Sequence, residues 1–407
     1  MTTNSGPAAA PKTLLPLLAV GAFAIGTDTF VVSGVLPSVA ESLRISIADA
    51  GWISTVFALV YACMAPVLGA VTGRLDRRLV MLISLVGFGL GNIASALAPN
   101  MAMLLLARAG TAAAAALFIP AASAVAAVTA APERRAQAMA VVLGGISVAT
   151  VAGVPFGTWV AADISWRATF SVVAAIGLLC AALIAVLLPP VALPAAPDLA
   201  TRLAPVRNPR VAATVLTTFL FLTGGYTALT YVGAVFWEPS NGSGTTLAVL
   251  LMVFGVAGVA GTMLAGRGTD RFGALPVLLA SIVILGAVLA ALPVAREHLA
   301  TSVIALALWG LAGMASQPAQ QHRLFSISPQ AGPLLFSLNS AATFAGIAAG
   351  GAIGNRVLQH GGASGVDALG LVGAGIVAVS LVTALVAVRI KAPAECAPAP
   401  VAAPAKS

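Results

Sequence analysis

Long apolar runs alternate with short polar breaks along almost the whole chain. A helix needs about 20 apolar residues to cross the hydrocarbon core of a bilayer, and twelve runs are long enough. The breaks between them carry charge, Pro or Gly, as in LDRR, APERR and TDRFG. The pattern therefore predicts an all-α membrane protein with twelve transmembrane helices. The runs cover residues 14–37, 51–72, 79–98, 101–125, 137–161, 167–188, 211–236, 243–266, 274–294, 300–320, 333–356 and 368–390.

The runs fall into two groups of six, divided by the longest polar connection. Residues 147–157 (SVATVAGVPFG) and 340–350 (SAATFAGIAAG) match at six of eleven positions, each in the fifth run of its group. Two related six-helix halves are a transporter architecture. We expect an N-terminal bundle over 1–188, a central cytoplasmic connection over 189–210, a C-terminal bundle over 211–390 and a disordered cytoplasmic tail, rich in Ala and Pro, over 391–407.

Composition and charge agree with a membrane protein. Of the 407 residues 60% are hydrophobic and only 8% are charged, against about 25% charged residues in average proteins. The net charge of +8 comes from 20 Lys and Arg scattered between the apolar runs, which argues against nucleic-acid binding. With a cytoplasmic N-terminus, fifteen Lys and Arg face the cytoplasm and four face outward, with Arg108 inside a run. Cytoplasmic loops are enriched in Lys and Arg, so we expect both termini in the cytoplasm.

Several motifs resemble the major facilitator superfamily, in particular its twelve-helix drug:proton antiporters of the chloramphenicol-resistance and arabinose-efflux-like type. GTDTFVVSGVLP (26–37) resembles their first-helix signature, and GAVTGRLDRR (69–78) resembles the loop after the second helix. LLLARAG (104–110) carries the fourth-helix Arg, and GVPFGTW (153–159) resembles the fifth-helix antiporter motif. SLNSAATFAGIAAGGAIG (337–354) is similar to the eleventh helix. The resemblance covers essentially the whole chain and implies the major facilitator fold, with two pseudo-symmetric six-helix bundles.

The loop motif departs from the family pattern in its first copy. The family usually has Asp where this chain has Gly73, and Gly where it has Asp76. The second copy keeps the pattern in GRGTDRFG (266–273). We expect charge pairs in these loops to hold the cytoplasmic helix ends together in the outward-open state, and the alternative is ordinary topology charge. The expected gating residues are Arg74, Asp76, Arg77, Asp270, Arg271 and Gly273.

Asp28 is the only acid inside an apolar run, and Arg108 is the only basic residue away from the ends of a run. A charge at the bilayer centre costs at least ~2.5 kcal/mol, so intramembrane charges are usually functional. Asp28 lies nine residues before Pro37, and Arg108 lies eight residues after Asn100, so the two sit at matching depth and can meet. Because burial disfavours a charged carboxyl group, Asp28 is the leading candidate proton carrier. The resemblance also assigns the fourth-helix Arg to proton coupling; the alternative is a permanent structural ion pair.

Small residues mark the fifth and eleventh runs. Gly153, Pro155 and Gly157 are expected to interrupt and bend the fifth helix, because Pro removes a backbone hydrogen bond. Gly153 and Gly157 have GxxxG spacing, which Gly346, Gly350 and Gly354 repeat in the eleventh run. Small faces allow close helix contact. We expect this contact to lie between the two halves.

A polar and aromatic stretch in the seventh run predicts a substrate cavity. Thr223, Thr227 and Thr230 share one helical face, with Tyr226 nearby. Gln317, Asn339 and Thr343 add neutral polar groups from the tenth and eleventh runs. A cavity with aromatic walls and a few neutral polar groups suits an uncharged, amphipathic ligand. The alternative for each residue is an interhelical hydrogen bond.

The sequence argues against an enzyme and against a metal or other cofactor. Its three Cys have no metal-ligand spacing, its three His lie at run ends or in breaks, and no nucleophile–base pattern is visible. GPAAAPKT (6–13) only outlines a phosphate-binding loop, because Pro11 replaces the second Gly. We therefore expect the proton gradient, rather than ATP bound by this chain, to supply the energy.

The resemblance implies a proton-coupled secondary transporter, monomeric, in a bacterial inner membrane. We expect it to export small amphipathic drug-like molecules by alternating access, as a chloramphenicol-type or multidrug antiporter conferring antibiotic resistance. The main alternative is an exporter of a sugar, a nucleoside or another metabolite. A uniporter and a non-transporting receptor on the same fold are further alternatives, and insensitivity to a protonophore would favour the uniporter.

Overall fold

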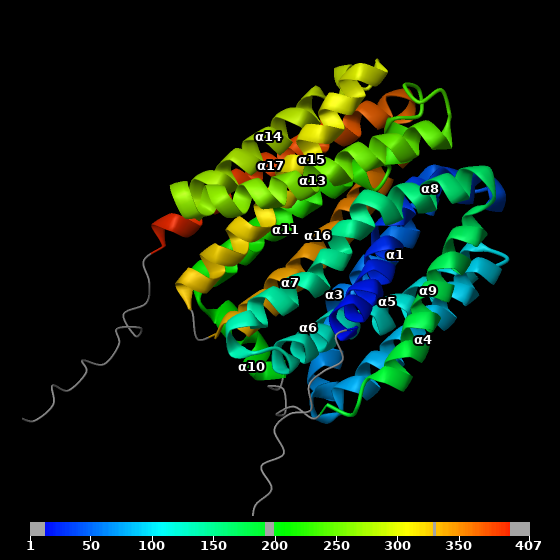
Figure 1. Cartoon of the computed structure of the whole chain (residues 1–407). Helices are drawn as coiled ribbons and strands as arrows, with labels where there is room; N and C mark the ends of the chain where they lie inside the picture. Colours follow the sequence, from blue (N-terminus) through cyan, green and yellow to red (C-terminus); the bar gives the residue numbers. More distant parts are fainter. Residues whose placement is uncertain (1–12, 192–198, 329–330, 391–407) are drawn as a thin grey trace, which may run out of the picture.

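The computed structural model describes residues 13–191, 199–328 and 331–390, and within them it is built from helices (Figure 1). Twelve helical spans are long and apolar enough to cross a membrane, so the predicted number of spans is confirmed. The first six spans are α1 (Leu14–Leu43), α2 with α3 (Ile47–Ala50, Trp52–Val71), α4 (Arg77–Leu97), α5 with α6 (Met101–Ala115, Phe118–Thr129), α7 with α8 (Arg135–Val148, Val154–Asp163) and α9 (Trp166–Leu187).

The second six spans follow a short helix, α10 (Leu199–Leu203), in the central connection. The disordered tail expected over 391–407 lies outside the described residues. The spans are α11 (Pro209–Leu229), continued by α12 (Val232–Val235), then α13 (Gly244–Phe272), α14 (Ala274–Ala295), α15 (Leu299–Ile327), α16 (Gly332–His360) and α17 (Gly365–Arg389).

Several helices are longer than the apolar runs that predicted them. The first helix continues through Pro37 to Leu43. Helix α13 continues to Phe272, so Asp270 and Arg271 lie in its last turn, and the expectation of a loop there is wrong. A helix that extends past the hydrocarbon core can carry charged residues where water reaches them, which the length of an apolar run does not reveal.

The helices form two halves that meet along two main contacts. The N-terminal half comprises α1–α9 and the C-terminal half comprises α11–α17, and between them α8 packs on α13 while α3 packs on α16 (Figure 1). Both ends of the described chain lie at the same end of the bundle, which we call the terminal end, and the opposite end is the distal end.

The two halves are in close contact at the distal end. Asn355 of α16 donates from Nδ2 to the carbonyl oxygen of Ala48 at 2.6 Å, and Gln359 donates from Nε2 to Asp49 Oδ1 at 3.2 Å. Gly51 lies directly against the ring of Tyr231, where a Cβ atom would clash. These contacts seal the bundle at this end.

A central cavity of about 280 Å³ lies between the halves, displaced toward the terminal end. On α16 its lining residues run from Phe336, one turn from the terminal end of the helix, to Ile347, which is still thirteen residues from the distal end. On α15 they run from Trp309 to Gln321. The cavity thus reaches close to the terminal end while the distal end is closed.

Candidate functional site

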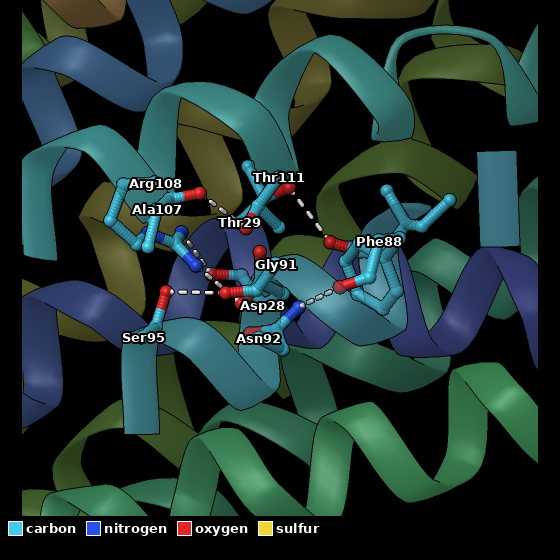
Figure 2. Close-up of polar contacts among 10 residues, drawn as sticks. Asp28, Thr29, Phe88, Gly91, Asn92, Ser95, Ala107, Arg108 and Thr111 are labelled. Carbon is cyan, nitrogen blue, oxygen red and sulfur yellow. Dashed lines mark hydrogen bonds and ion pairs between the residues drawn. The ribbon is translucent and has the colours of Figure 1, made fainter. Parts of the chain in front are cut away.

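A fully buried ion pair joins α1 to α5 inside the N-terminal half. Arg108 Nη1 lies 2.7 Å from Asp28 Oδ1, and both side chains are 0% exposed. The second guanidinium nitrogen, Nη2, donates to the backbone oxygen of Asp28 at 3.4 Å. The structure therefore brings together the two residues whose matching depth was inferred from the sequence (Figure 2).

Aromatic rings enclose the guanidinium group of Arg108. Its Cζ atom lies 4.5 Å from the ring centre of Phe57 on α3 and 5.1 Å from that of Phe170 on α9. Both phenylalanines are buried. A cation over an aromatic face is attracted by the ring quadrupole, more strongly where water is excluded. The positive charge therefore keeps favourable partners other than the carboxylate.

Three buried polar atoms of this cluster have no hydrogen-bond partner among the described residues: Asp28 Oδ2, Arg108 Nε and Asn92 Oδ1. Asn92, on α4, lies beside Asp28 and donates from Nδ2 to the carbonyl oxygen of Phe88 at 3.1 Å (Figure 2). Native structures leave few buried polar atoms unpaired, so three in one cluster mark an unusual site. Asn92 was not among the site residues predicted from the sequence, although an amide inside an apolar run was a visible signal.

The ion pair lies beside the central cavity but not in its wall. Ile25, Gly26, Thr29 and Phe30 of α1 line the cavity, whereas the Asp28 side chain is on another face of the helix and is buried in the N-terminal half. The same short stretch of α1 therefore provides part of the cavity wall on one face and the acid of the ion pair on another.

The cavity wall is aromatic and uncharged. None of the lining residues that the structure describes is Asp, Glu, Lys, Arg or His. Neutral polar groups come mostly from the C-terminal half, as Gln317 and Gln321 on α15 and Asn339, Ser340 and Thr343 on α16. Such a wall suits an uncharged, amphipathic molecule. The aromatic lining residues are Phe30, Tyr61, Phe221, Tyr226, Phe254, Trp309, Phe336 and Phe344.

Four of the seven predicted cavity residues line this cavity, namely Tyr226, Gln317, Asn339 and Thr343. The prediction is wrong for Thr223, Thr227 and Thr230, which are buried and absent from the lining. These threonines do share a helical face, but that face packs on α16, where the glycines lie against the backbone of α11. The sequence missed Gln321, Ser340 and Trp309 as lining residues.

The cavity amides belong to a network of amides and hydroxyls inside the C-terminal half, which Arg323 joins away from the cavity by donating from Nη1 to Gln320 Oε1 at 3.1 Å. Thr218 donates to Asn339 Oδ1 at 2.7 Å and accepts from Gln320 Nε2 at 2.9 Å. Asn339 Nδ2 donates to Gln317 Oε1 at 3.3 Å, and Gln317 Nε2 donates to Thr343 Oγ1 at 3.5 Å. The network therefore connects fully buried groups to the cavity wall.

The small-residue motifs pack within the halves, so the expected contact between halves is wrong for them. Gly153 and Gly157 lie against Thr27 and Val31 of α1. A π-helical turn at Ala149–Gly153 precedes Pro155, which lies in the first turn of α8, so the predicted interruption is present. Gly346, Gly350 and Gly354 lie against the backbone of α11, at Phe219, Thr223 and Thr227.

The loop charges take local roles in this conformation. Asp76 accepts from the backbone N–H of Leu79 at 3.2 Å and caps α4, while Arg77 donates to the carbonyl oxygen of Gly73 at 3.1 Å. Gly273 has φ +87°, which only glycine adopts readily, and it ends α13. Among the described residues, no ion pair joins Arg74, Asp76 or Arg77 to Asp270 or Arg271. Their role in gating stays a prediction about the opposite conformation.

The central connection contacts the N-terminal half through α10. Arg202 donates from Nη2 to the carbonyl oxygen of Gly69 at 3.0 Å. Partial burial, together with the nearby positive charge of Arg77, lowers the pKa of the Arg202 guanidinium. This contact fastens the connection between the halves to the end of α3.

Comparison with known proteins gives a consistent family assignment. The family model of the Major Facilitator Superfamily matches residues 18–320. An uncharacterized MFS-type transporter of Bacillus subtilis, YbcL, is 30% identical over 84% of this chain and 88% of its own length. The inner membrane transport protein YdhP of Escherichia coli K12 is 30% identical over 88% of this chain and 92% of its own. A probable sugar efflux transporter of Mannheimia succiniciproducens is 30% identical over 90% and 91%.

Solved structures share the fold at low sequence identity. A bacterial homologue of the human lysosomal transporter Spinster has a TM-score of 0.76 at 17% identity, over 97% of this chain and 100% of that one. A D-xylose–proton symporter has a TM-score of 0.70 at 18% identity, over 90% and 96%. With twelve spans in two halves around a central cavity, and with these relatives, the chain belongs to the major facilitator superfamily of multi-pass membrane transporters.

Proposed function

We propose that this chain is a proton-coupled antiporter that exports small, uncharged, amphipathic molecules from the cytoplasm by alternating access. The observation that carries the proposal is the buried Asp28–Arg108 ion pair beside a neutral, aromatic cavity. Drug-like compounds of the chloramphenicol type are the proposed substrates. The proton gradient is the proposed energy source, with neither a metal nor an organic cofactor.

The ion pair supports proton coupling because its strength depends on the charge of Asp28. With the carboxylate ionised, Arg108 holds it at 2.7 Å. A proton on Asp28 removes the attraction, yet Arg108 keeps its contacts with Phe57 and Phe170. An ion pair that breaks on protonation removes the link between α1 and α5, and α1 also lines the cavity. One charge moved across 100 mV is worth about 2.3 kcal/mol, so each proton supports roughly fifty-fold accumulation.

The closed distal end supports alternating access with the cavity open to the cytoplasm. We propose that both termini are cytoplasmic, as the distribution of Lys and Arg predicts, so that the terminal end faces the cytoplasm of a bacterium. The opposite state then requires the contacts of Asn355 and Gln359 with α2 to break. We propose that the gating charges, Asp270 and Arg271 among them, pair in that state. The proposed working unit is a monomer, since one chain contains the whole cavity.

Export of a sugar or another metabolite is a second candidate, favoured by two observations. A relative with 30% identity is named as a probable sugar efflux transporter. The C-terminal wall also presents Gln317, Gln321, Asn339 and Ser340, whose neutral amides and hydroxyl suit a hydroxylated ligand. Eight aromatic lining residues favour the more apolar substrate, which is why drug-like compounds stay the first candidate.

The two candidates separate in a host that lacks its own efflux pumps. Cells expressing the chain are tested for retention of a compound panel that includes labelled chloramphenicol and a labelled monosaccharide, with and without a protonophore. We expect reduced retention of chloramphenicol-like compounds that the protonophore reverses. Reduced retention of the monosaccharide alone supports the second candidate, and export that a protonophore leaves unchanged contradicts proton coupling.

A further inference from the structure

We propose that Asn92 is a positioning residue for the proton: its side-chain carbonyl oxygen, Oδ1, accepts a hydrogen bond from the protonated carboxyl group of Asp28. The inference rests on the proposed role of Asp28 as the proton carrier and deepens it. It assigns a partner to the neutral state of Asp28, as Arg108 is the partner of the ionised state.

The geometry supplies an acceptor at the right place. Figure 2 shows Asp28 between Arg108 and Asn92. Asp28 Oδ1 is occupied by Arg108, whereas Oδ2 is buried without a hydrogen-bond partner among the described residues. Asn92 is 0% exposed, its Nδ2 is engaged by Phe88, and its Oδ1 is likewise buried and unpaired. Two acceptor oxygens thus lie unpaired in one enclosed site.

A hydrogen atom between two such oxygens would give both of them a partner. Two lone acceptors cannot bond to each other, but a carboxylic acid is a donor. Arg108 has donors only, so it can bind the carboxylate and cannot accept from the acid. Neighbouring hydroxyl groups already donate within their own helices, Ser95 to Gly91 at 2.9 Å and Thr111 to Ala107 at 2.8 Å (Figure 2). These hydroxyl oxygens can still accept, but Asn92 Oδ1 is a buried acceptor beside Asp28 that makes no hydrogen bond among the described residues.

The step balances with water as the proton source. A hydronium ion gives its proton to Asp28 Oδ2, one O–H bond forms, and the carboxylate charge is lost. The new O–H donates to Asn92 Oδ1, while Arg108 keeps its charge between Phe57 and Phe170. Release of the proton to water restores the ion pair. Because an unpaired buried donor is costly, the amide stabilises the loaded state.

Other titratable groups near α1 have partners elsewhere. Arg167 on α9 donates to Ser42 and to Ala98 at the distal end. Cys180 on α9 contacts the carbonyl oxygen of Leu17, near the terminal end. Tyr61 on α3 faces the cavity and stacks on Phe344. Arg108 is therefore the charged group that acts on Asp28, and Asn92 is the neutral side chain that acts on it.

Infrared difference spectra of the purified full chain, recorded across pH without any substrate, test the proposal. The band of the Asp28 acid is identified as the carboxylic C=O band that Asp28→Asn removes. In Asn92→Leu we expect this band at higher frequency, with its pH midpoint lowered by about one unit, because the acid loses its acceptor. Asn92→Gln keeps an amide and should keep most of the wild-type midpoint. Ser95→Ala, which removes a neighbouring buried hydroxyl, is the matched control and should leave the band in place.

Each outcome decides the question. An unmoved band in Asn92→Leu overturns the proposal, and a midpoint raised in that variant shows that the amide serves the ionised state instead. If Asn92→Leu does not fold, Asn92→Ala is read by the same criteria. Absence of any Asp28 acid band over the whole pH range overturns the role of Asp28 itself, which keeps that failure distinct from a failure of Asn92.

Discussion

The two halves of this transporter bury polar groups of different kinds. The N-terminal half encloses a full ion pair, Asp28 with Arg108, away from the cavity wall. The C-terminal half encloses neutral amides and hydroxyls, and its network reaches the wall through Gln317 and Thr343. Arg323 is hydrogen-bonded to Gln320 at the edge of this network, but the amides and hydroxyls themselves do not change their charge with pH, whereas the Asp28 carboxyl group can. We therefore expect that protonation and the polar contacts to the ligand use different halves and can be separated by substitution.

The largest expected effect is on stability, from breaking the ion pair. Arg108→Leu leaves a buried carboxyl group without its counter-ion, and removing one partner of a buried pair typically costs about 3–5 kcal/mol. Thr218→Val in the C-terminal half removes only neutral hydrogen bonds, those with Asn339 and Gln320, at about 1–3 kcal/mol. Melting temperatures in detergent should therefore fall more for Arg108→Leu. The double variant Asp28→Asn/Arg108→Leu should recover much of the lost stability. Equal decreases in melting temperature for Arg108→Leu and for the variant of the C-terminal half would contradict the difference between the halves.

The next effect concerns how tightly the helices pack in each half. A Cβ at Gly350 meets the backbone oxygen of Thr223, whereas a Cβ at Gly157 meets the side chains of Val31 and Thr169. A side chain can rotate more easily than a helix backbone can move, and overpacking costs about 1–3 kcal/mol. Gly350→Ala should lower the melting temperature more than Gly157→Ala. Gly375→Ala, where nothing lies within 4 Å of the added Cβ, serves as control and should be neutral or stabilising.

A smaller effect separates ligand binding from protonation. Gln317→Leu and Thr343→Val remove neutral hydrogen-bonding groups from the C-terminal wall. A lost hydrogen bond worth about 1 kcal/mol raises the KM for an exported compound by roughly five-fold. Initial export rates at several concentrations measure this change. The dependence of export on pH should stay as in the wild type, and a displaced pH profile would show that the halves do not divide the two tasks.

The smallest effect is expected at the distal end. Gln359→Ala removes an exposed hydrogen bond to Asp49, while Asn355→Ala removes a buried one to the backbone of Ala48. Exposed pairs contribute only a few tenths of a kcal/mol up to about 1, so Gln359→Ala should change the balance of conformations less than Asn355→Ala does. Distances between spin labels across the distal end report this balance. A larger shift of the label distances in Gln359→Ala than in Asn355→Ala would contradict this expected order of effects.

The features that the sequence predicted are those fixed by length and by isolated charge. Twelve apolar runs identified twelve spans because a bilayer sets the length of a helix. Asp28 and Arg108 were paired by depth because each is the sole charge of its sign away from the ends of a run. That inference held although Pro37 lies within α1 and does not end it.

The features that it missed depend on which helix faces which. Thr223, Thr227 and Thr230 share a face, but the pattern does not reveal that α16 rather than the cavity covers it. Phe57 and Phe170 come from two further helices, and the sequence does not single them out from the other phenylalanines. These roles follow from tertiary packing alone.

The central claim, that Asp28 carries the proton while the neutral cavity binds the ligand, is tested most directly in proteoliposomes. Proteoliposomes with Asp28→Asn or with the wild type are loaded with labelled chloramphenicol, or with another panel compound that the wild type exports. Exchange of the compound is compared with its accumulation under a pH gradient. We predict that Asp28→Asn retains exchange of labelled for unlabelled compound and loses accumulation driven by an imposed pH gradient. Accumulation at the wild-type level in Asp28→Asn under the same gradient would contradict the account.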